Sequence, residues 1–77
     1  MHREDNTVAR NLRLYRSWRS KSIEQTAREL KISSTRYKNY ETGVWHVPEE
    51  IVNRACKLYN IPKKMMYRIE PVNPAAS

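Results

Sequence analysis

Four polar side chains at helical spacing have the chemistry to read the edges of DNA bases: Ser34, Thr35, Lys38 and Asn39. At about 100° per residue they share one face of a helix, whereas Tyr37 and Tyr40 point to the opposite side. In a major groove, Lys38 could donate to guanine, Asn39 could pair with adenine, and the two hydroxyl groups could contact thymine. An ordinary solvated face is the alternative, because polar outer faces are the rule for helices.

Basic residues flank this segment and could neutralise backbone phosphates: Arg19, Lys21, Lys31 and Arg36. Scattered surface charge explains any one of them equally well. The chain of 77 residues has fifteen Lys and Arg against eight Asp and Glu, a net charge of +7. Such a balance is typical of small nucleic-acid-binding domains. A membrane-surface helix would need a wide basic face opposite a bulky apolar one, and no segment has that pattern.

The residues that usually carry catalysis, metal binding or nucleotide binding are nearly absent. The only glycine, Gly43, rules out glycine-rich phosphate loops, and the single Cys56 rules out a disulfide or a thiolate zinc site. Asp5, His2 and His46 form no metal or acid–base pattern, and His46 reads as a surface residue. We therefore expect no enzyme, cofactor, metal or small-molecule ligand; activity lost in a His46→Ala variant would reverse this view.

The N-terminal sequence lacks the apolar stretch of a secretion signal, and no apolar run reaches the roughly eighteen residues of a membrane span. A single cysteine suits a reducing compartment. We therefore expect a cytoplasmic protein that has no contact with membranes.

Apolar residues recur at spacings of three and four, which predicts an all-α bundle of five short helices. Asp5 or Asn6 could cap the first helix, which should end near residues 18–19. Ser22 fits a capping box that begins the second helix, with its hydroxyl accepting from the Gln25 amide, and this helix should stop near residue 31. Ser33 should cap the third.

Prolines and a glycine mark the later boundaries. Gly43 should close the third helix in the left-handed conformation, and Pro48 should lie in the first turn of the fourth, which ends at Asn60. Pro62 should open a last short helix. These boundaries predict one domain over residues 1–69 and a disordered tail over residues 70–77.

The expected core consists of the apolar stripes of these helices: Val8, Leu12, Tyr15, Ile23, Ala27, Leu30, Tyr37, Tyr40, Ile51, Val52, Ala55 and Leu58. Cys56 should be a buried apolar residue. Trp45 could cover the core. Met65, Met66 and Tyr67 could close the core or form a self-association surface, and Ile69 could belong to the last helix.

Over residues 7–68 the sequence resembles the lambda-repressor-like helix-turn-helix domains of phage Cro and repressor proteins and their bacterial relatives. The resemblance is carried by five blocks in the right order: Val8-x3-Leu12-x2-Tyr15-Arg16, Ser22-x4-Ala27-x2-Leu30-x-Ile32-Ser33, Tyr37-x2-Tyr40-Glu41-x-Gly43, Pro48 and Ile61-Pro62. It implies a DNA-binding transcriptional regulator, expected to be a repressor that occludes a promoter, and a homodimer that binds an inverted repeat with the third helix in the major groove.

The resemblance implies base contacts by the same four residues as the helical wheel, and a structural ion pair between Arg16 and Glu41. It adds phosphate contacts by Trp45 and His46 in the loop after the reading helix. The family usually has glycine where this chain has Lys31, so either Lys31 is left-handed or the turn differs.

Two further departures affect the second helix. Lys21 replaces a leucine, so Trp18 or Ile23 must fill that part of the core. Ile23 also replaces a phosphate-binding glutamine, and the Ser22 hydroxyl and nearby amides could make that contact instead.

A phage-type repressor, a restriction-system controller and an antitoxin-type regulator would share these features. A helix-turn-helix module for protein–protein interaction or non-specific DNA binding is the alternative function.

Overall fold

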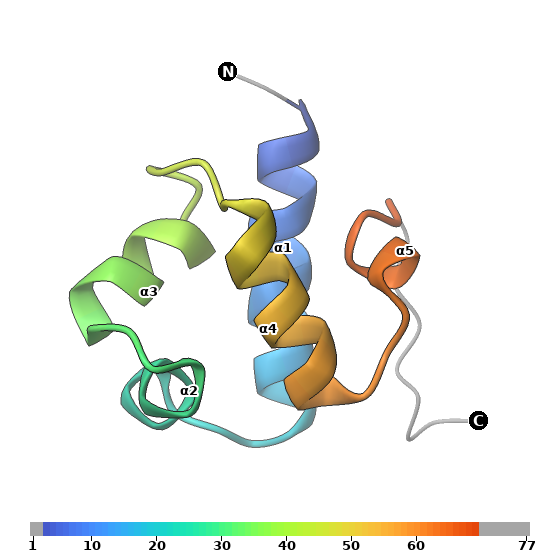
Figure 1. Ribbon diagram of the computed structural model, residues 1–77. Coiled ribbons are helices and arrows are strands. Elements are labelled where there is room, and N and C mark those ends of the chain that lie inside the picture. Colours follow the sequence, from blue (N-terminus) through green and yellow to red (C-terminus); the bar gives the residue numbers. More distant parts are fainter. Residues whose placement is uncertain (1–2, 70–77) are drawn as a thin grey trace.

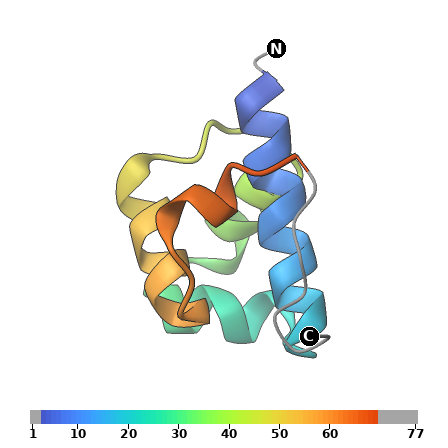
Figure 2. The same ribbon diagram turned by 90° about the vertical axis from the view of Figure 1, so that its right-hand side faces the viewer.

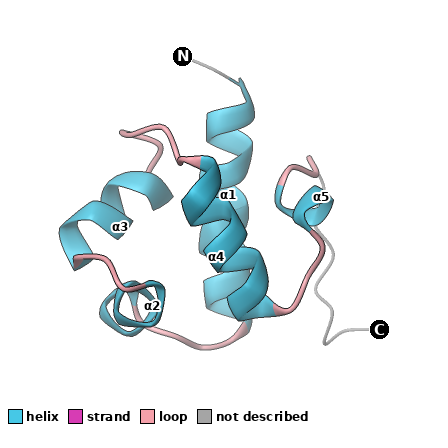
Figure 3. Ribbon diagram, viewed as in Figure 1, coloured by secondary structure: helices cyan, strands magenta, loops and turns pink. Residues whose placement is uncertain are grey.

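The computed structural model describes residues 3–69, with side chains described from Thr7 onward. Five α-helices follow one another: α1 (Arg3–Trp18), α2 (Ile23–Leu30), α3 (Ser34–Glu41), α4 (Glu49–Tyr59) and α5 (Lys63–Met66). The described residues contain no strand (Figure 3), so the all-α prediction is confirmed. His2 and the expected tail over residues 70–77 lie outside the described part of the chain.

Side-chain caps begin α2 and α3 where the sequence predicted them. The Ser22 hydroxyl accepts a hydrogen bond from the Gln25 amide at 3.0 Å, and the Ser33 hydroxyl accepts one from the Arg36 amide at 3.1 Å. Each bond satisfies an amide that has no partner within its own helix. Gly43 follows α3 at a φ of 81°, the left-handed conformation predicted for it.

Two boundaries differ from the prediction. The helix α1 begins at Arg3, so the expected cap at Asp5 or Asn6 is wrong. An acidic residue is favourable in the first turn of a helix as well as at its cap, which made the two positions hard to tell apart. Pro48 is the N-cap of α4 and lies one position before its first turn.

The helices form a small bundle in which α2 and α3 lie on one side and α5 on the other, with α1 and α4 between them (Figure 1). The second view shows α2 lying across the lower end of the bundle, next to the end of α1 (Figure 2). The rings of Tyr15 and Tyr59 stack with centroids 5.6 Å apart and join α1 to α4. The core is therefore shared by helices from all parts of the chain.

The buried core follows the predicted stripes closely: Val8, Leu12, Tyr15, Ala27, Leu30, Tyr37, Tyr40, Val47, Ile51, Val52, Ala55, Cys56, Tyr59 and Met66. Leu58, Ile23 and Trp18 are partly buried and pack against this cluster. Tyr59 was not predicted in the core. None of the described helices is long and apolar enough to cross a membrane.

The segment that contains α5 closes one end of the core. Met66 is fully buried, and the buried Asn11 side chain donates to the Met66 carbonyl at 2.7 Å and the Arg68 carbonyl at 2.8 Å. Met65 is half-buried, whereas Tyr67 and Ile69 are exposed. Ile69 lies outside the last helix, to which the sequence could have assigned it, because α5 ends at Met66.

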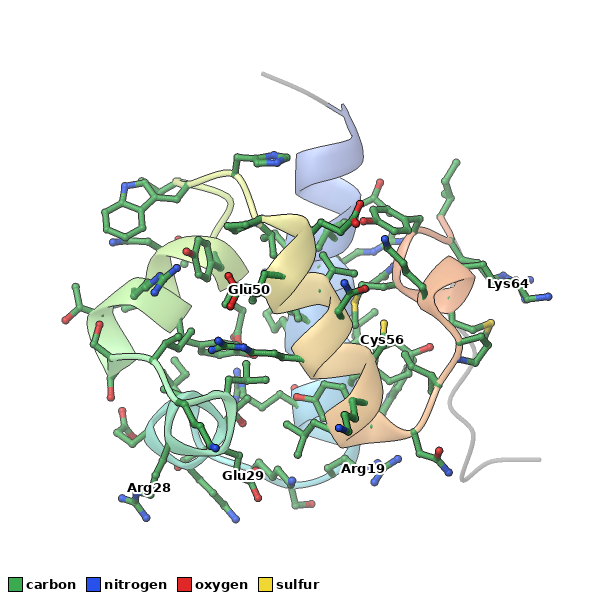
Figure 4. The ribbon with its side chains drawn as sticks, viewed as in Figure 1. Arg19, Arg28, Glu29, Glu50, Cys56 and Lys64 are labelled. Carbon is green, nitrogen blue, oxygen red and sulfur yellow. The ribbon has the colours of Figure 1, made fainter. Side chains whose placement is uncertain are left out.

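Cys56 is buried between α4 and α5, as Figure 4 shows. Burial raises the pKa of its thiol, which keeps it protonated and unreactive.

Candidate nucleic-acid interface

The left-handed backbone conformation of Lys31 forms the turn between α2 and α3. This residue is left-handed, with φ 62° and ψ 41°, and the following Ile32 amide donates to the Ala27 carbonyl at 3.0 Å. The side chain of Lys31 is exposed. Lysine therefore adopts the conformation that glycine adopts more readily, at a cost of roughly 1 kcal/mol.

The predicted reading face lies on the outer side of α3. Ser34, Thr35 and Lys38 are exposed and Asn39 is half-buried, while Tyr37 and Tyr40 are buried on the inner side. The chain thus gathers the four polar residues on one accessible surface. Their hydroxyl, ammonium and amide groups supply both donors and acceptors there.

A bidentate ion pair fixes α3 against α1. The guanidinium of Arg16 donates to Glu41 through Nε at 2.9 Å and through Nη2 at 2.7 Å. Its Nη1 donates to the Lys21 carbonyl at 2.9 Å, which also ties down the chain between α1 and α2. The Glu41 side chain is only 5% exposed, and its hydrogen bond raises the pKa of Arg16. The pair that was expected from the sequence is therefore present and sets the orientation of the reading helix.

Two of the basic residues near α2 already have partners in the protein. Arg19 donates to the Tyr59 carbonyl at 2.9 Å, and its guanidinium carbon lies 5.7 Å from the Tyr59 ring centroid. Figure 4 shows Arg19 beside the lower end of α4, far from α3. Lys21 forms an ion pair with Glu29 at 2.7 Å. The basic residues singled out in the sequence do not form one cluster, because Arg19 stabilises the end of α4.

Arg36 lies on α3 and is bound to Tyr40, one turn further along the helix. Its Nε donates to the Tyr40 hydroxyl at 2.6 Å, and its guanidinium carbon lies 5.5 Å from the ring centroid. Sequence reasoning placed Tyr40 in the core only. The signal that could have identified this contact is the i, i+4 spacing of the two residues.

The loop between α3 and α4 exposes several of its side chains. Trp45 is 47% exposed and its ring meets that of Tyr40 edge-on, with centroids 6.1 Å apart. The expectation that Trp45 covers the core is wrong, because Val47 fills the buried position of this loop. His46, in the same loop, is exposed, and so is Ser22 at the start of α2. Among the described residues, no group of His, Cys, Asp or Glu could hold a metal ion.

A comparison with protein families agrees with this geometry. Residues 7–66 match the family model described as a helix-turn-helix domain. The chain belongs to this helix-turn-helix family, which confirms the resemblance seen in its sequence. Membership of the family indicates a DNA-binding regulator. Searches among curated proteins and among solved structures found no match.

Proposed function

We propose that the protein is a sequence-specific transcriptional regulator that binds double-stranded DNA with α3 in the major groove. The observation that supports this most directly is the outer face of α3, where Ser34, Thr35, Lys38 and Asn39 are accessible. An α-helix with its side chains is about 10–12 Å in diameter, which suits the roughly 12 Å width of the major groove. The Arg16–Glu41 pair holds this helix at a fixed angle.

Binding as a homodimer to an inverted repeat is part of the proposal, with repression by occlusion of a promoter. Half-sites one helical turn apart place two reading helices about 34 Å apart. Phosphate contacts on either side of the groove are assigned to six of the predicted residues: Lys21, Ser22, Lys31, Arg36, Trp45 and His46. Arg19 is left out, because its guanidinium is bound to the Tyr59 carbonyl at the end of α4.

The proposal is tested by selecting binding sites from a randomised 30-base-pair duplex library with the wild-type protein and an Asn39→Ala variant. We expect an inverted repeat, and relaxed preference at one position in each half-site for the variant, at a loss of about 1–3 kcal/mol of discrimination there. Asn53→Ala is the matched control, because Asn53 is an exposed asparagine on α4, outside the reading face. It should select the same sequence as the wild type.

The other outcomes separate the alternatives. A single half-site would keep α3 as the reading helix and overturn the symmetric dimer. Weak, salt-sensitive binding to every duplex would replace the proposal by non-specific DNA binding. No binding to any duplex would favour a protein-interaction module.

Replacing Lys31 by glycine is expected to change stability and DNA affinity in opposite directions. Glycine relieves the left-handed strain, so the free energy of unfolding should rise by up to about 1 kcal/mol. Loss of the exposed ammonium group should weaken DNA binding and lower the magnitude of its log–log salt slope by about 0.9 for each phosphate that is no longer neutralised. Urea denaturation and salt-dependent binding titrations measure the two effects.

The matched control for this variant is Ser20→Gly. Ser20 is also left-handed, at a φ of 55°, but it carries no charge. It should gain stability without any change in salt slope. Equal DNA binding by the wild-type protein and the Lys31→Gly variant would show that Lys31 makes no phosphate contact.

A further inference from the structure

Arg36 occupies the edge of the reading face. On α3 at about 100° per residue, it lies 60° beyond Asn39 and between Asn39 and the inward-facing Tyr40. A side chain at this edge lies beside the groove when the centre of the face is inside it. The nearest groups that such a side chain can bind are the phosphates of the DNA backbone that borders the groove.

The guanidinium of Arg36 is held in place before any ligand is present. Its Nε–H is used by the Tyr40 hydroxyl, and it makes no other hydrogen bond to the part of the chain that the structure describes. Tyr40 is itself fixed, since its side chain is buried and only 4% exposed. The two terminal amino groups of the guanidinium therefore keep their donors for a ligand, in the planar fork that suits a phosphate.

Trp45 packs against the same tyrosine ring. Its indole meets Tyr40 at an interplanar angle of 67°, and its backbone amide donates to the Asn39 carbonyl at 3.1 Å. The loop is thus tied to the end of the reading helix by its main chain. Trp45 as a residue is 47% exposed, so its large aromatic ring is available to pack against a partner.

We propose that Arg36, Tyr40 and Trp45 form a preorganised clamp for the DNA backbone, in which Arg36 binds a phosphate and Trp45 packs on the adjoining deoxyribose. Tyr40 is the positioning residue: it contacts no DNA and acts by holding Arg36. This clamp rests on the proposed function. It goes further in two ways: Arg36 is held in position before DNA binds, and the buried Tyr40 contributes to binding by holding it.

The test combines Tyr40→Phe with Arg36→Gln, singly and together, in binding titrations against a fixed duplex at several salt concentrations. Tyr40→Phe keeps the buried ring but removes the hydroxyl that holds Arg36. We expect affinity to fall by about threefold to tenfold, the range for immobilising one long side chain. In the Arg36→Gln background the same change should have no effect. Arg36→Gln itself should lower the magnitude of the salt slope by about 0.9 per half-site.

Lys64→Gln is the control for the loss of one positive charge. Lys64 lies on α5, on the far side of the molecule from α3 (Figure 4). This variant should keep the wild-type salt slope. The chain has two tryptophans, so a Trp18→Phe variant keeps only Trp45. The fluorescence emission of Trp45 should shift to shorter wavelength when the duplex covers the indole.

Three results would overturn the clamp. One is an equal loss of affinity from Tyr40→Phe whether or not Arg36 is present, which would make Tyr40 a structural residue only. Another is an unchanged salt slope in Arg36→Gln. The third is unchanged Trp45 emission on saturating duplex. All three results are obtained with a wild-type protein that binds DNA. If the wild-type protein binds no duplex, the proposed function and the clamp are overturned together, and this outcome differs from the other three.

Discussion

Arg16→Ala is expected to lower the free energy of unfolding by about 3–5 kcal/mol, the range for breaking a buried ion pair on one side. The substitution leaves Glu41, whose side chain is 5% exposed, as an unpaired carboxylate in the core. It also removes the donor to the Lys21 carbonyl. A domain of 77 residues has a total stability of roughly 4–12 kcal/mol, so a large fraction of the variant should unfold at physiological temperature. Urea denaturation followed by circular dichroism measures the loss.

The matched control is Glu50→Ala, which breaks the pair between Glu50 and Arg54 on the surface of α4. Those side chains are 69% and 41% exposed, so the loss should stay below about 1 kcal/mol. If Arg16→Ala also lowered the free energy of unfolding by less than about 1 kcal/mol, burial would not make this ion pair more important than a surface pair. Combining Arg16→Met with Glu41→Leu should recover much of the stability, because neither charge then remains buried without its partner.

We expect this ion pair to couple the proposed DNA binding to folding. The reading helix α3 has only eight residues, which is too short to be stable alone. Its orientation comes from the Arg16–Glu41 pair and from the buried rings of Tyr37 and Tyr40. A variant without the pair should lose DNA binding because α3 is no longer held in place, even though neither residue lies on the reading face.

Local signals in the sequence predicted the elements well. Ser22 and Ser33 cap helices because their hydroxyl groups reach amides three residues away, and this contact depends only on neighbouring residues. Gly43 and Asn60 end helices for a similarly local reason, since both tolerate the left-handed conformation. The outer face of α3 follows from helical periodicity alone.

Contacts between distant segments were harder to predict. Asn11 lies among apolar neighbours in α1, and only the position of α5 shows that its amide binds the carbonyls of Met66 and Arg68. Arg19 looked available for phosphates until the end of α4 supplied the Tyr59 carbonyl. The exposure of Trp45 depends on which loop residue fills the core, and composition contains no information on that choice.

Alkaline pH is expected to unfold the protein through its buried tyrosines. Tyr15, Tyr37 and Tyr59 are at most 1% exposed, and burial raises the pKa of all three, that of Tyr59 to about 12. Above pH 10 these side chains ionise in the unfolded chain but stay protonated in the folded one. The folded state then binds more protons, so the free energy of unfolding falls as pH rises. For Tyr59 alone the loss between about pH 10 and 12 amounts to roughly 2 kcal/mol.

Thermal unfolding at a series of pH values from neutral to 12, together with tyrosinate absorbance, measures this effect. The melting temperature should be steady below pH 9 and fall steeply above pH 10, and the buried tyrosines should ionise together with the loss of helical signal. Tyr59→Phe removes one of the titrating groups and should make the fall less steep, whereas Tyr67→Phe should not, because Tyr67 is 41% exposed. Ionisation of all five tyrosines near pH 10 with the helices intact would contradict the burial of this cluster. Since Tyr37 is part of the inner face of α3, DNA binding should be lost over the same pH range as the fold.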